Sequence, residues 1–263
     1  MKQAMIFAAG LGTRLKPLTD TMPKALVRVG GQPLLWHVVQ KLKAAGYERI
    51  IINVHHFAEQ IVDYLKANDN FGLDIRISDE TSGLLETGGG IKKARPLFDP
   101  ESPILIHNVD ILSNVELTGT GPMSSITWGL SPMCEAGEEH GDCPLCDSAD
   151  ALLLVSNRKT KRYLQFDEEM RLVGWKNIET GEVKGQEGRS LAFSGIHVIS
   201  PSMFPLMDEW PDRFPIMDFY LKTCSEHLIV GYDKKNLRLL DVGKLDSLQE
   251  AEKFLETNNH NLP

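Results

Sequence analysis

The chain opens with an apolar run that breaks into a glycine loop, and this feature limits most strongly how its first segment can fold. Residues 4–9 are apolar throughout, and Gly10 and Gly12 follow at once. A short apolar run is typical of a buried strand, and glycines at its end are typical of a turn. The opening segment therefore predicts a buried strand whose carboxyl end is a glycine loop.

Strand-like and helix-like segments alternate after this first strand. The predicted strands cover residues 49–54, 73–77 and 103–107. The predicted helices cover residues 33–45, 57–65 and 91–97. This alternation predicts an α/β fold, Rossmann-like, with a mostly parallel central sheet and helices on both faces. Ligands bind beyond the carboxyl ends of such strands. The polar and glycine residues at these ends are Gly10, Asn53, Asn108 and Asp110.

The alternation is interrupted once and then resumes. Residues 118–150 hold Gly, Pro, Ser, Cys and Glu with little periodicity, which indicates an irregular insertion. Beyond it we expect strands at 151–155, 191–199 and 237–242, a hairpin over 162–175 and a final helix at 245–255. The chain therefore divides into residues 1–117, the insertion at 118–150 and a β-rich part at 151–263.

Composition excludes several classes of protein. The chain is 42% apolar and 24% charged, which is typical of globular proteins. Its net charge of −8 argues against nucleic acid as a partner, so anionic ligands would have to meet a few local cations. No apolar run approaches the ~20 residues that span a membrane, and no signal peptide is recognisable. We therefore expect a cytoplasmic protein whose cysteines are thiols or metal ligands.

Residues 8–26, AAGLGTRLKPLTDTMPKAL, combine glycines, prolines and cations in one loop. Gly10 and Gly12 allow backbone N–H groups to point at a ligand, and such a nest binds phosphate oxygens. Arg14 adds a forked donor for phosphate, and Lys24 adds a point charge. The residues expected to contact a nucleotide here are Ala8, Ala9, Gly10, Gly12, Thr13, Arg14 and Lys24.

Other kinds of glycine loop fit this segment less well. A dinucleotide-binding fingerprint requires a third glycine at position 15, where the chain has Leu15. A Walker loop requires Gly-Lys followed by Ser or Thr, which the chain lacks. A plain strand-to-helix turn does not explain two glycines, two prolines and two cations together.

The pattern G-x-G-T-R-L-x-P-L-T-x-x-x-P-K-x-L, here residues 10–26, resembles the signature of the nucleoside-diphosphate-sugar pyrophosphorylases, which are sugar-1-phosphate nucleotidyltransferases. The resemblance covers most of the chain except the insertion. It implies that Arg14 and Lys24 are catalytic and stabilise charge on the α-phosphate and the leaving pyrophosphate. It also implies that residues 1–117 are the nucleotide-binding half, and residues 151–263 the sugar-phosphate-binding half, of one domain.

The string ETGGG at residues 86–90 resembles the family's segment of small residues against which a nucleobase and ribose lie. The resemblance implies nucleotide contacts for Glu86, Thr87 and Gly88, and we expect Asn108 to join them. A glycine helix cap or turn is the alternative. Within the family, the string is most similar to N-acetylmuramate-1-phosphate uridylyltransferases and mannose-1-phosphate guanylyltransferase-like proteins.

Asp110 and Asp241 each end a predicted strand, far apart in the sequence. Mg²⁺ prefers oxygen ligands, usually one or two carboxylates with phosphates and waters. The resemblance implies that both aspartates bind Mg²⁺ and that Asp110 is catalytic; the alternative is two solvated strand-end caps. Two departures from the family pattern accompany them. Val109 replaces the usual glycine before Asp110, and residues 238–240 lack the usual tryptophan.

The sugar-phosphate site is expected in the second half. Residues 193–196, FSGI, resemble the family's sugar-contacting segment, which implies contacts from Ser194 and Gly195. Lys176 lies where many members have a Glu-Lys-Pro lysine that holds the sugar phosphate, although the proline is absent here. A solvated hairpin lysine is the alternative. Asn157, which follows a predicted buried strand, is a further candidate.

The insertion carries Cys134, His140, Cys143 and Cys146, the last two as C-x-x-C. Such a Cys/His set can form a tetrahedral structural Zn²⁺ site. The alternative is a set of unligated thiols, and the family pattern has no such site.

The resemblance implies transfer of a nucleotidyl group from UTP or GTP to a sugar-1-phosphate, with Mg²⁺ as cofactor and pyrophosphate as product. The partners would be these small molecules, without nucleic acid or membrane, and the protein a monomer or small homo-oligomer. The alternatives are a phosphocholine cytidylyltransferase of the same fold and a non-catalytic nucleotide-sugar-sensing subunit. A sensor would be expected to lose cations or carboxylates that this chain keeps. A glycosyltransferase would use a D-x-D motif, which Asp110-Ile111-Leu112 does not form.

Overall fold

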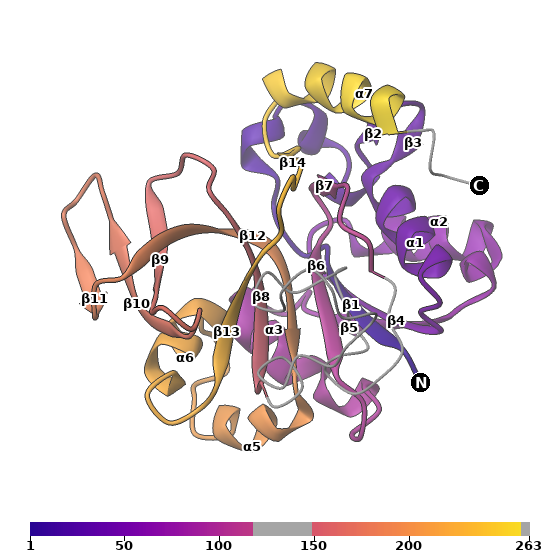
Figure 1. The fold of residues 1–263 in the computed structure, drawn as a ribbon. Coiled ribbons are helices and arrows are strands. Elements are labelled where there is room, and N and C mark those ends of the chain that lie inside the picture. The colour runs from indigo at the N-terminus through magenta and orange to yellow at the C-terminus, as the bar shows by residue number, and fades with distance from the viewer. Residues whose placement is uncertain (118–148, 259–263) are drawn as a thin grey trace.

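A ten-stranded mixed sheet forms the centre of the protein, in the order β11-β10-β9-β12-β6-β1-β4-β5, with β8 and β13 paired beside β12 (Figure 1). The computed structural model describes residues 1–117 and 149–258. The strands are β1 (Gln3–Phe7), β4 (Arg49–Val54), β5 (Asp74–Asp79), β6 (Ile104–Asn108), β8 (Ala151–Ser156), β9 (Arg162–Phe166), β10 (Leu172–Asn177), β11 (Val183–Gly185), β12 (Arg189–Ile199) and β13 (Ile229–Asp233).

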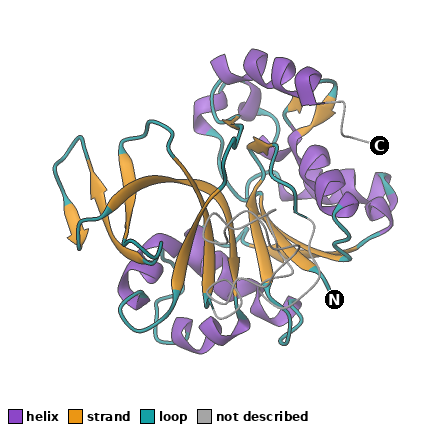
Figure 2. Cartoon of the chain, viewed as in Figure 1, coloured by secondary structure: helices purple, strands orange, loops and turns teal. Residues whose placement is uncertain are grey.

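The first half of the sheet is parallel, as the sequence predicts. β1 pairs in parallel with β4 and with β6, and β4 pairs in parallel with β5. Consecutive side chains of a strand point to opposite faces, and Met5, Ile6, Ile51 and Ile52 are all fully buried. Both faces are therefore covered, and Figure 2 shows helices outside the strands. The helices of this half are α1 (Leu34–Ala44), α2 (Ala58–Ala67) and α3 (Glu86–Ala94).

β12 changes the sheet from parallel to antiparallel pairing. It pairs antiparallel with β6, β8 and β9, and its register against β8 shifts between Phe193 and His197. Gly195, inside this irregularity, has a φ of 76°, a left-handed conformation that favours glycine. The strand arcs here to carry β9, β10 and β11 (Figure 1), and β9 and β10 are the hairpin expected over residues 162–175.

A separate two-stranded pair brings distant segments together. β7 (Ile111–Ser113) follows β6 closely, and β14 (Leu239–Asp241) pairs antiparallel with it. The helix after β14 contacts a short strand that follows the glycine loop (Figure 1). The remaining elements are α7 (Asp246–Asn258), β2 (Arg28–Val29), β3 (Gln32–Pro33), α5 (Phe204–Met207) and α6 (Ile216–Thr223). The last helix thus packs beside the segment that follows the glycine loop.

α5 and α6 are helices that the sequence did not predict, and α3 differs from expectation in where it begins. It begins at Glu86 rather than near residue 91, so the ETGGG string forms its first turns. Glycine is a poor helix former, but backbone N–H groups of Gly88 and Gly89 both donate to the carbonyl oxygen of Phe214, at 2.8 and 3.2 Å. Tertiary hydrogen bonds therefore compensate for weak helix propensity.

Two predictions fall on residues that are not described. Residues 118–148 make up most of the insertion expected at 118–150 and lie outside the described residues. The zinc site predicted from Cys134, His140, Cys143 and Cys146 lies there too and stays a prediction. None of the described helices is long and apolar enough to cross a membrane.

Gly89→Ala is expected to lower the free energy of unfolding by about 1–3 kcal/mol. The reason is that a Cβ on Gly89 would lie 2.0 Å from the carbonyl oxygen of Asp212, so α3 would have to move. Gly83→Ala is the matched control, since a Cβ there meets no atom within 4 Å. Urea denaturation followed by circular dichroism measures both, and equal stability of the two variants would contradict this packing.

Candidate active site

The glycine loop folds back on itself directly after β1. Gly12 has φ 62°, and a Cβ there would lie 2.9 Å from Cγ2 of Thr19 and 3.0 Å from Cβ of Lys24. The Thr19 hydroxyl donates to the carbonyl oxygen of Gly12 at 2.9 Å. Position 12 therefore requires glycine for two reasons: the left-handed backbone conformation, and the close approach of Lys24, which leaves no room for a Cβ.

One stretch of this loop is open to a ligand. Gly10 is exposed, and a Cβ there would meet no atom within 4 Å. Among the described residues, the backbone N–H groups of Gly10, Leu11 and Gly12 have no hydrogen-bond acceptor. These groups are free to bind an anion, which fits the phosphate nest that the sequence predicts.

The N–H groups of the first two loop residues are already engaged within the protein, and a nucleotide contact through their other atoms stays a prediction. The N–H groups of Ala8 and Ala9 donate to Oδ1 of Asn53, at 2.7 and 3.3 Å, and both residues are buried. These two N–H groups are engaged within the protein and are not available to a nucleotide. The sequence alone could not reveal this, because the acceptor lies on another strand.

The two aspartates expected to bind metal lie together. Asp110 directly precedes β7, and β14 ends at Asp241, which pairs with Ile111. The N–H of Val242 also donates to the carbonyl oxygen of Asp110 at 2.8 Å. The β7–β14 pairing is therefore the local cause of a carboxylate pair built from opposite halves of the chain.

Two cations of the glycine loop face this carboxylate pair. Lys24 forms an ion pair with Asp110, and both side chains are only 13% exposed. Arg14 and Asp241 line the same space: a Cβ on Gly243 would lie 2.8 Å from Nη2 of Arg14 and 2.6 Å from Oδ1 of Asp241. Arg14, Lys24, Asp110 and Asp241 thus form one cluster, which we call the charged cluster.

Electrostatics make the charged cluster receptive to a further cation. Partial burial raises the pKa of Asp241, and the nearby Asp110 carboxylate raises it further, against the opposing effects of Lys24 and Arg14. Two crowded carboxylates are a donor set that suits Mg²⁺ when phosphates and waters complete its ligands. The described residues hold no group of three or more His, Cys, Asp or Glu side chains that could bind a metal alone.

Arg158 also lies close enough to influence the charged cluster, and the sequence patterns did not indicate it. It follows Asn157, the exposed residue after β8, and its Nη2 donates to the carbonyl oxygen of Phe193 at 2.8 Å. Its charge also lowers the pKa of Asp241. The signal for Arg158 in the sequence was its place after a buried strand, next to Asn157.

The expected sugar-site residues are partly assembled. A Cβ on Gly195 would lie 2.9 Å from Nδ2 of Asn108, so these two predicted residues are neighbours near Asp110. Ser194 is fully buried, and its hydroxyl has no partner among the described residues. Lys176 lies on β10, partly exposed, and forms no ion pair with the described residues. The structure therefore groups Asn108 with Gly195. Lys176 lies elsewhere, on the three strands β9, β10 and β11, which we call the β9–β11 arm.

The ETGGG residues contact the protein itself. The hydroxyl of Thr87 accepts a hydrogen bond from the N–H of Ile216 at 2.9 Å, and a Cβ on Gly88 would lie 2.2 Å from the Phe214 ring. Glu86 pairs with Arg213 at 3.1 Å. Packing against residues 212–216 is thus sufficient to explain why these residues are small, and their nucleotide contacts stay a prediction.

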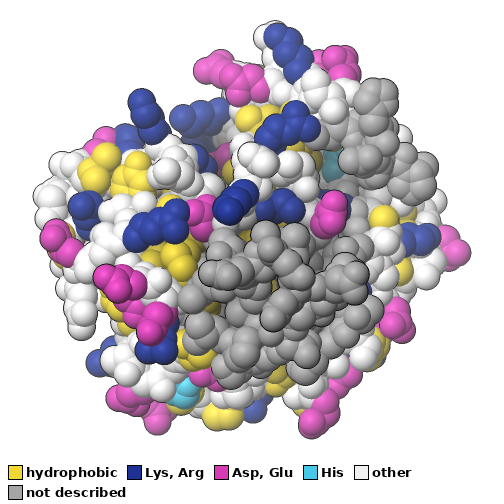
Figure 3. All heavy atoms as spheres, in the orientation of Figure 1, with side chains coloured by type: hydrophobic (Ala, Val, Ile, Leu, Met, Phe, Trp, Pro, Cys, Tyr) yellow, Lys and Arg dark blue, Asp and Glu magenta, His cyan; other side chains and the backbone are white. Residues whose placement is uncertain are grey.

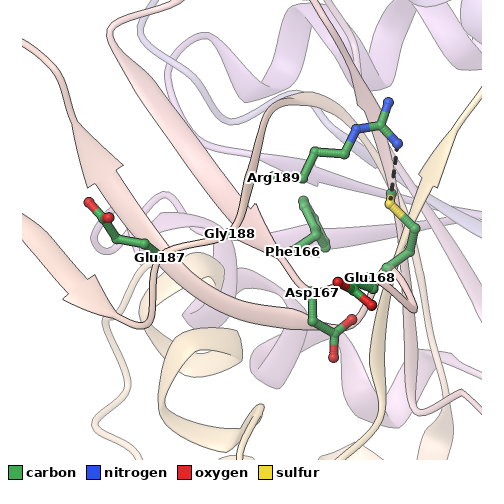
Figure 4. A pocket seen from close by; sticks show the side chains of 7 residues that line it. Phe166, Asp167, Glu168, Glu187, Gly188 and Arg189 are labelled. Carbon is green, nitrogen blue, oxygen red and sulfur yellow. Dashed lines mark hydrogen bonds between the residues drawn. The ribbon is translucent and has the colours of Figure 1, made fainter.

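One face of the molecule carries many basic side chains, and a cavity lies among other residues. Figure 3 shows Lys and Arg side chains gathered across the middle of one face, although the chain carries a net charge of −8. A cavity of about 560 Å³ lies at the β9–β10 turn (Figure 4). Its lining residues include none of the expected site residues; they are Phe166, Asp167, Glu168, Met170, Glu187, Gly188 and Arg189.

Known proteins match the chain along its length. The family model described as nucleotidyl transferase matches residues 3–120. N-acetylmuramate alpha-1-phosphate uridylyltransferase of Neisseria meningitidis serogroup B is 36% identical over 251 residues, 95% of this chain and 96% of that protein. The protein of the same name from Caulobacter vibrioides is 49% identical over 111 residues, a match to 41% of this chain and 46% of that protein. The solved structure of HddC from Yersinia pseudotuberculosis has the same fold, with TM-score 0.72, 23% identity and coverage of 97% of this chain and 100% of that one.

The two aspartates are expected to respond oppositely to neutralisation in metal-free buffer at pH 7. Asp241→Asn should raise the unfolding temperature, because the raised pKa of Asp241 means that its ionised form is disfavoured in the fold. Asp110→Asn should lower it, because Lys24 loses its partner. The gain from Asp241→Asn should shrink as the pH falls through the raised pKa of Asp241 and vanish below the ordinary carboxyl pKa. Calorimetry of both variants would contradict this scheme if their shifts had the same sign.

Proposed function

The chain belongs to the sugar-1-phosphate nucleotidyltransferase family, and we propose that it transfers the uridylyl group of UTP to N-acetylmuramate-1-phosphate. The observation that carries the proposal is the meeting of Arg14, Lys24, Asp110 and Asp241 beside an open glycine loop. The choice of substrates is supported by the names of the two relatives described above, one of which aligns along almost its full length.

The reaction is an in-line displacement. A phosphate oxygen of the sugar-1-phosphate attacks the α-phosphorus of UTP, a new P–O bond forms, and the bond to the β-phosphate breaks to release pyrophosphate. The attacking oxygen already carries negative charge at neutral pH, so no general base is required. The protein's task is to position two anions and to neutralise the charge between them.

Each part of the loop has a place in this task. The free N–H groups of Gly10, Leu11 and Gly12 would bind phosphate oxygens of UTP, and the guanidinium of Arg14 would bridge two of them. Asp110 and Asp241 would hold Mg²⁺, which when bound neutralises phosphate charge. Lys24 is paired with Asp110 in the structure, so a metal at Asp110 would leave Lys24 free to pair with a phosphate.

The sugar-1-phosphate would enter from the side of β12. Asn108, Ser194 and Gly195 lie at the bulge next to the carboxylate pair, and Asn157 lies on the loop that follows β8. Ser194, with an unpartnered hydroxyl, would supply a hydrogen bond if the bulge opened to the substrate. Lys176 would contribute only if the β9–β11 arm closed over the site. Because nucleoside triphosphates are made in the cytoplasm, we place the reaction there.

Pyrophosphate release is the direct test. With Mg²⁺ present, UTP, GTP, CTP and dTTP are each combined with N-acetylmuramate-1-phosphate, mannose-1-phosphate, glucose-1-phosphate or phosphocholine. Turnover is expected with UTP and N-acetylmuramate-1-phosphate, and EDTA should abolish it. Asp110→Asn should lower kcat by about 100-fold or more, as loss of a charged group at the reacting phosphates does.

Other outcomes of the same panel separate the alternatives. Turnover of GTP with mannose-1-phosphate, or of CTP with phosphocholine, would replace the proposed substrates within the same family. Tight binding of a nucleoside triphosphate without turnover of any acceptor would contradict the enzymatic proposal and favour a sensing subunit. Arg162→Gln is the control variant. It removes one exposed charge from β9, in the β9–β11 arm.

A further inference from the structure

A buried hydrogen-bond network lies beneath the glycine loop. Asn53, at the end of β4, is 3% exposed, and its Oδ1 accepts the N–H groups of Ala8 and Ala9. Its Nδ2 donates to Oε1 of Glu80 at 2.8 Å, and Glu80 is completely buried. One amide thus joins the backbone of the loop to a carboxylate that follows β5.

The same carboxylate fixes the start of α3. Oε2 of Glu80 accepts the N–H of Leu85 at 3.2 Å, directly before the helix. A Cβ on Gly90 would lie 2.9 Å from Oε1 of Glu80, so α3 packs on the carboxylate itself. The carbonyl oxygen of Glu80 is also bonded to Nδ1 of His55, at 2.6 Å. The network therefore links the glycine loop to the ETGGG helix, the two segments expected to contact the nucleotide.

Hydrogen bonds hold both carboxylate oxygens of the buried Glu80. Within the described part of the chain, Glu80 has no ion-pair partner, and a buried carboxylate without a counter-ion is expensive unless hydrogen bonds satisfy it. A neutral side chain could fill the same space at lower cost. The hydrogen bonds also have fixed directions: the amide must accept from the loop and donate to the carboxylate.

We propose that Asn53 and Glu80 are positioning residues for the nucleotide, forming a clamp that holds the glycine loop in register with the start of α3. The clamp engages Ala8 and Ala9, and the next N–H groups, from Gly10 to Gly12, stay without an acceptor among the described residues and so are free for a triphosphate. The identification of the ligand as UTP rests on the proposed function. The clamp itself requires only that a nucleoside triphosphate binds at the loop.

A reciprocal exchange of the two side chains tests the clamp. Asn53→Asp places two carboxylates together. Glu80→Gln puts the new amide donor opposite either Nδ2 of Asn53 or the N–H of Leu85, so two donors face each other in both orientations. The double variant restores every bond: the carboxylate introduced at position 53 accepts from the loop and from the amide introduced at position 80, whose oxygen accepts from Leu85. Charge and shape are nearly unchanged in the double variant, so only the direction of the bonds is altered.

Three quantities are measured for each variant: the Kd of MgUTP by calorimetry, the KM of each substrate, and the unfolding temperature. Each single variant is expected to raise the Kd and KM for UTP about tenfold or more, as the loss of a buried hydrogen bond does. The KM for the sugar-1-phosphate should stay within about twofold, and the double variant should recover to within about threefold of the wild type.

Gln3→Glu is the matched control, at the opposite end of β1. Gln3 is 1% exposed and its amide donates to the carbonyl oxygens of Asp99 and Ser102, at 2.8 and 2.7 Å. Its change to an acid should lower stability without altering the Kd of MgUTP. If Asn53→Asp does not fold, Glu80→Gln and the double variant still give the comparison.

Several results would overturn the clamp. These are single variants with unchanged Kd, a double variant whose losses add instead of cancelling, or losses of affinity matched by Gln3→Glu. Failure of the proposed function gives a different result: the wild type would bind MgUTP but turn over no sugar-1-phosphate, while the double-variant recovery of Kd would still support the clamp. A wild type that binds no nucleoside triphosphate would overturn both.

Discussion

The repulsion between Asp110 and Asp241 is the constraint on which the active-site architecture depends. Pairing of β7 with β14 forces the two carboxylates together, and partial burial together with the neighbouring Asp110 carboxylate raises the pKa of Asp241. Lys24 and Arg14 belong to the glycine loop and relieve the repulsion because the loop folds back on itself. Gly12 permits that fold. A strand pair, a glycine loop and four charged side chains therefore form one interdependent unit.

The sheet supplies the rigid support that this unit needs. The loop follows the buried strand β1, and Asp110 follows β6, the parallel neighbour of β1. Both charged partners are thus held at the same edge of the sheet, where parallel strands end. The bulge at Gly195 brings β12 to this edge from the antiparallel side, so that the two halves of the chain meet at the carboxylate pair.

Much of this arrangement could be predicted from the sequence, because short apolar runs mark the buried strands and charged residues mark their ends. The family resemblance implies that Asp110 and Asp241 bind one metal; the structure places the two carboxylates near each other, and their role as metal ligands stays a prediction. The start of α3 was missed, because glycine propensity argues against a helix and the compensating contacts come from Phe214. The roles of Ala8, Ala9 and Arg158 depend on partners distant in sequence, on β4 and on β12, which local pattern cannot reveal.

The central claim is that the carboxylate pair and the glycine loop together bind one metal–triphosphate complex. Crystals soaked with Mn²⁺ and UTP test it most directly, since manganese can be located by its anomalous scattering. We predict a single strong peak within about 2.5 Å of carboxylate oxygens of both Asp110 and Asp241, with triphosphate oxygens completing the ligands. A metal held by the triphosphate alone, with Asp110 still paired to Lys24, would contradict the claim.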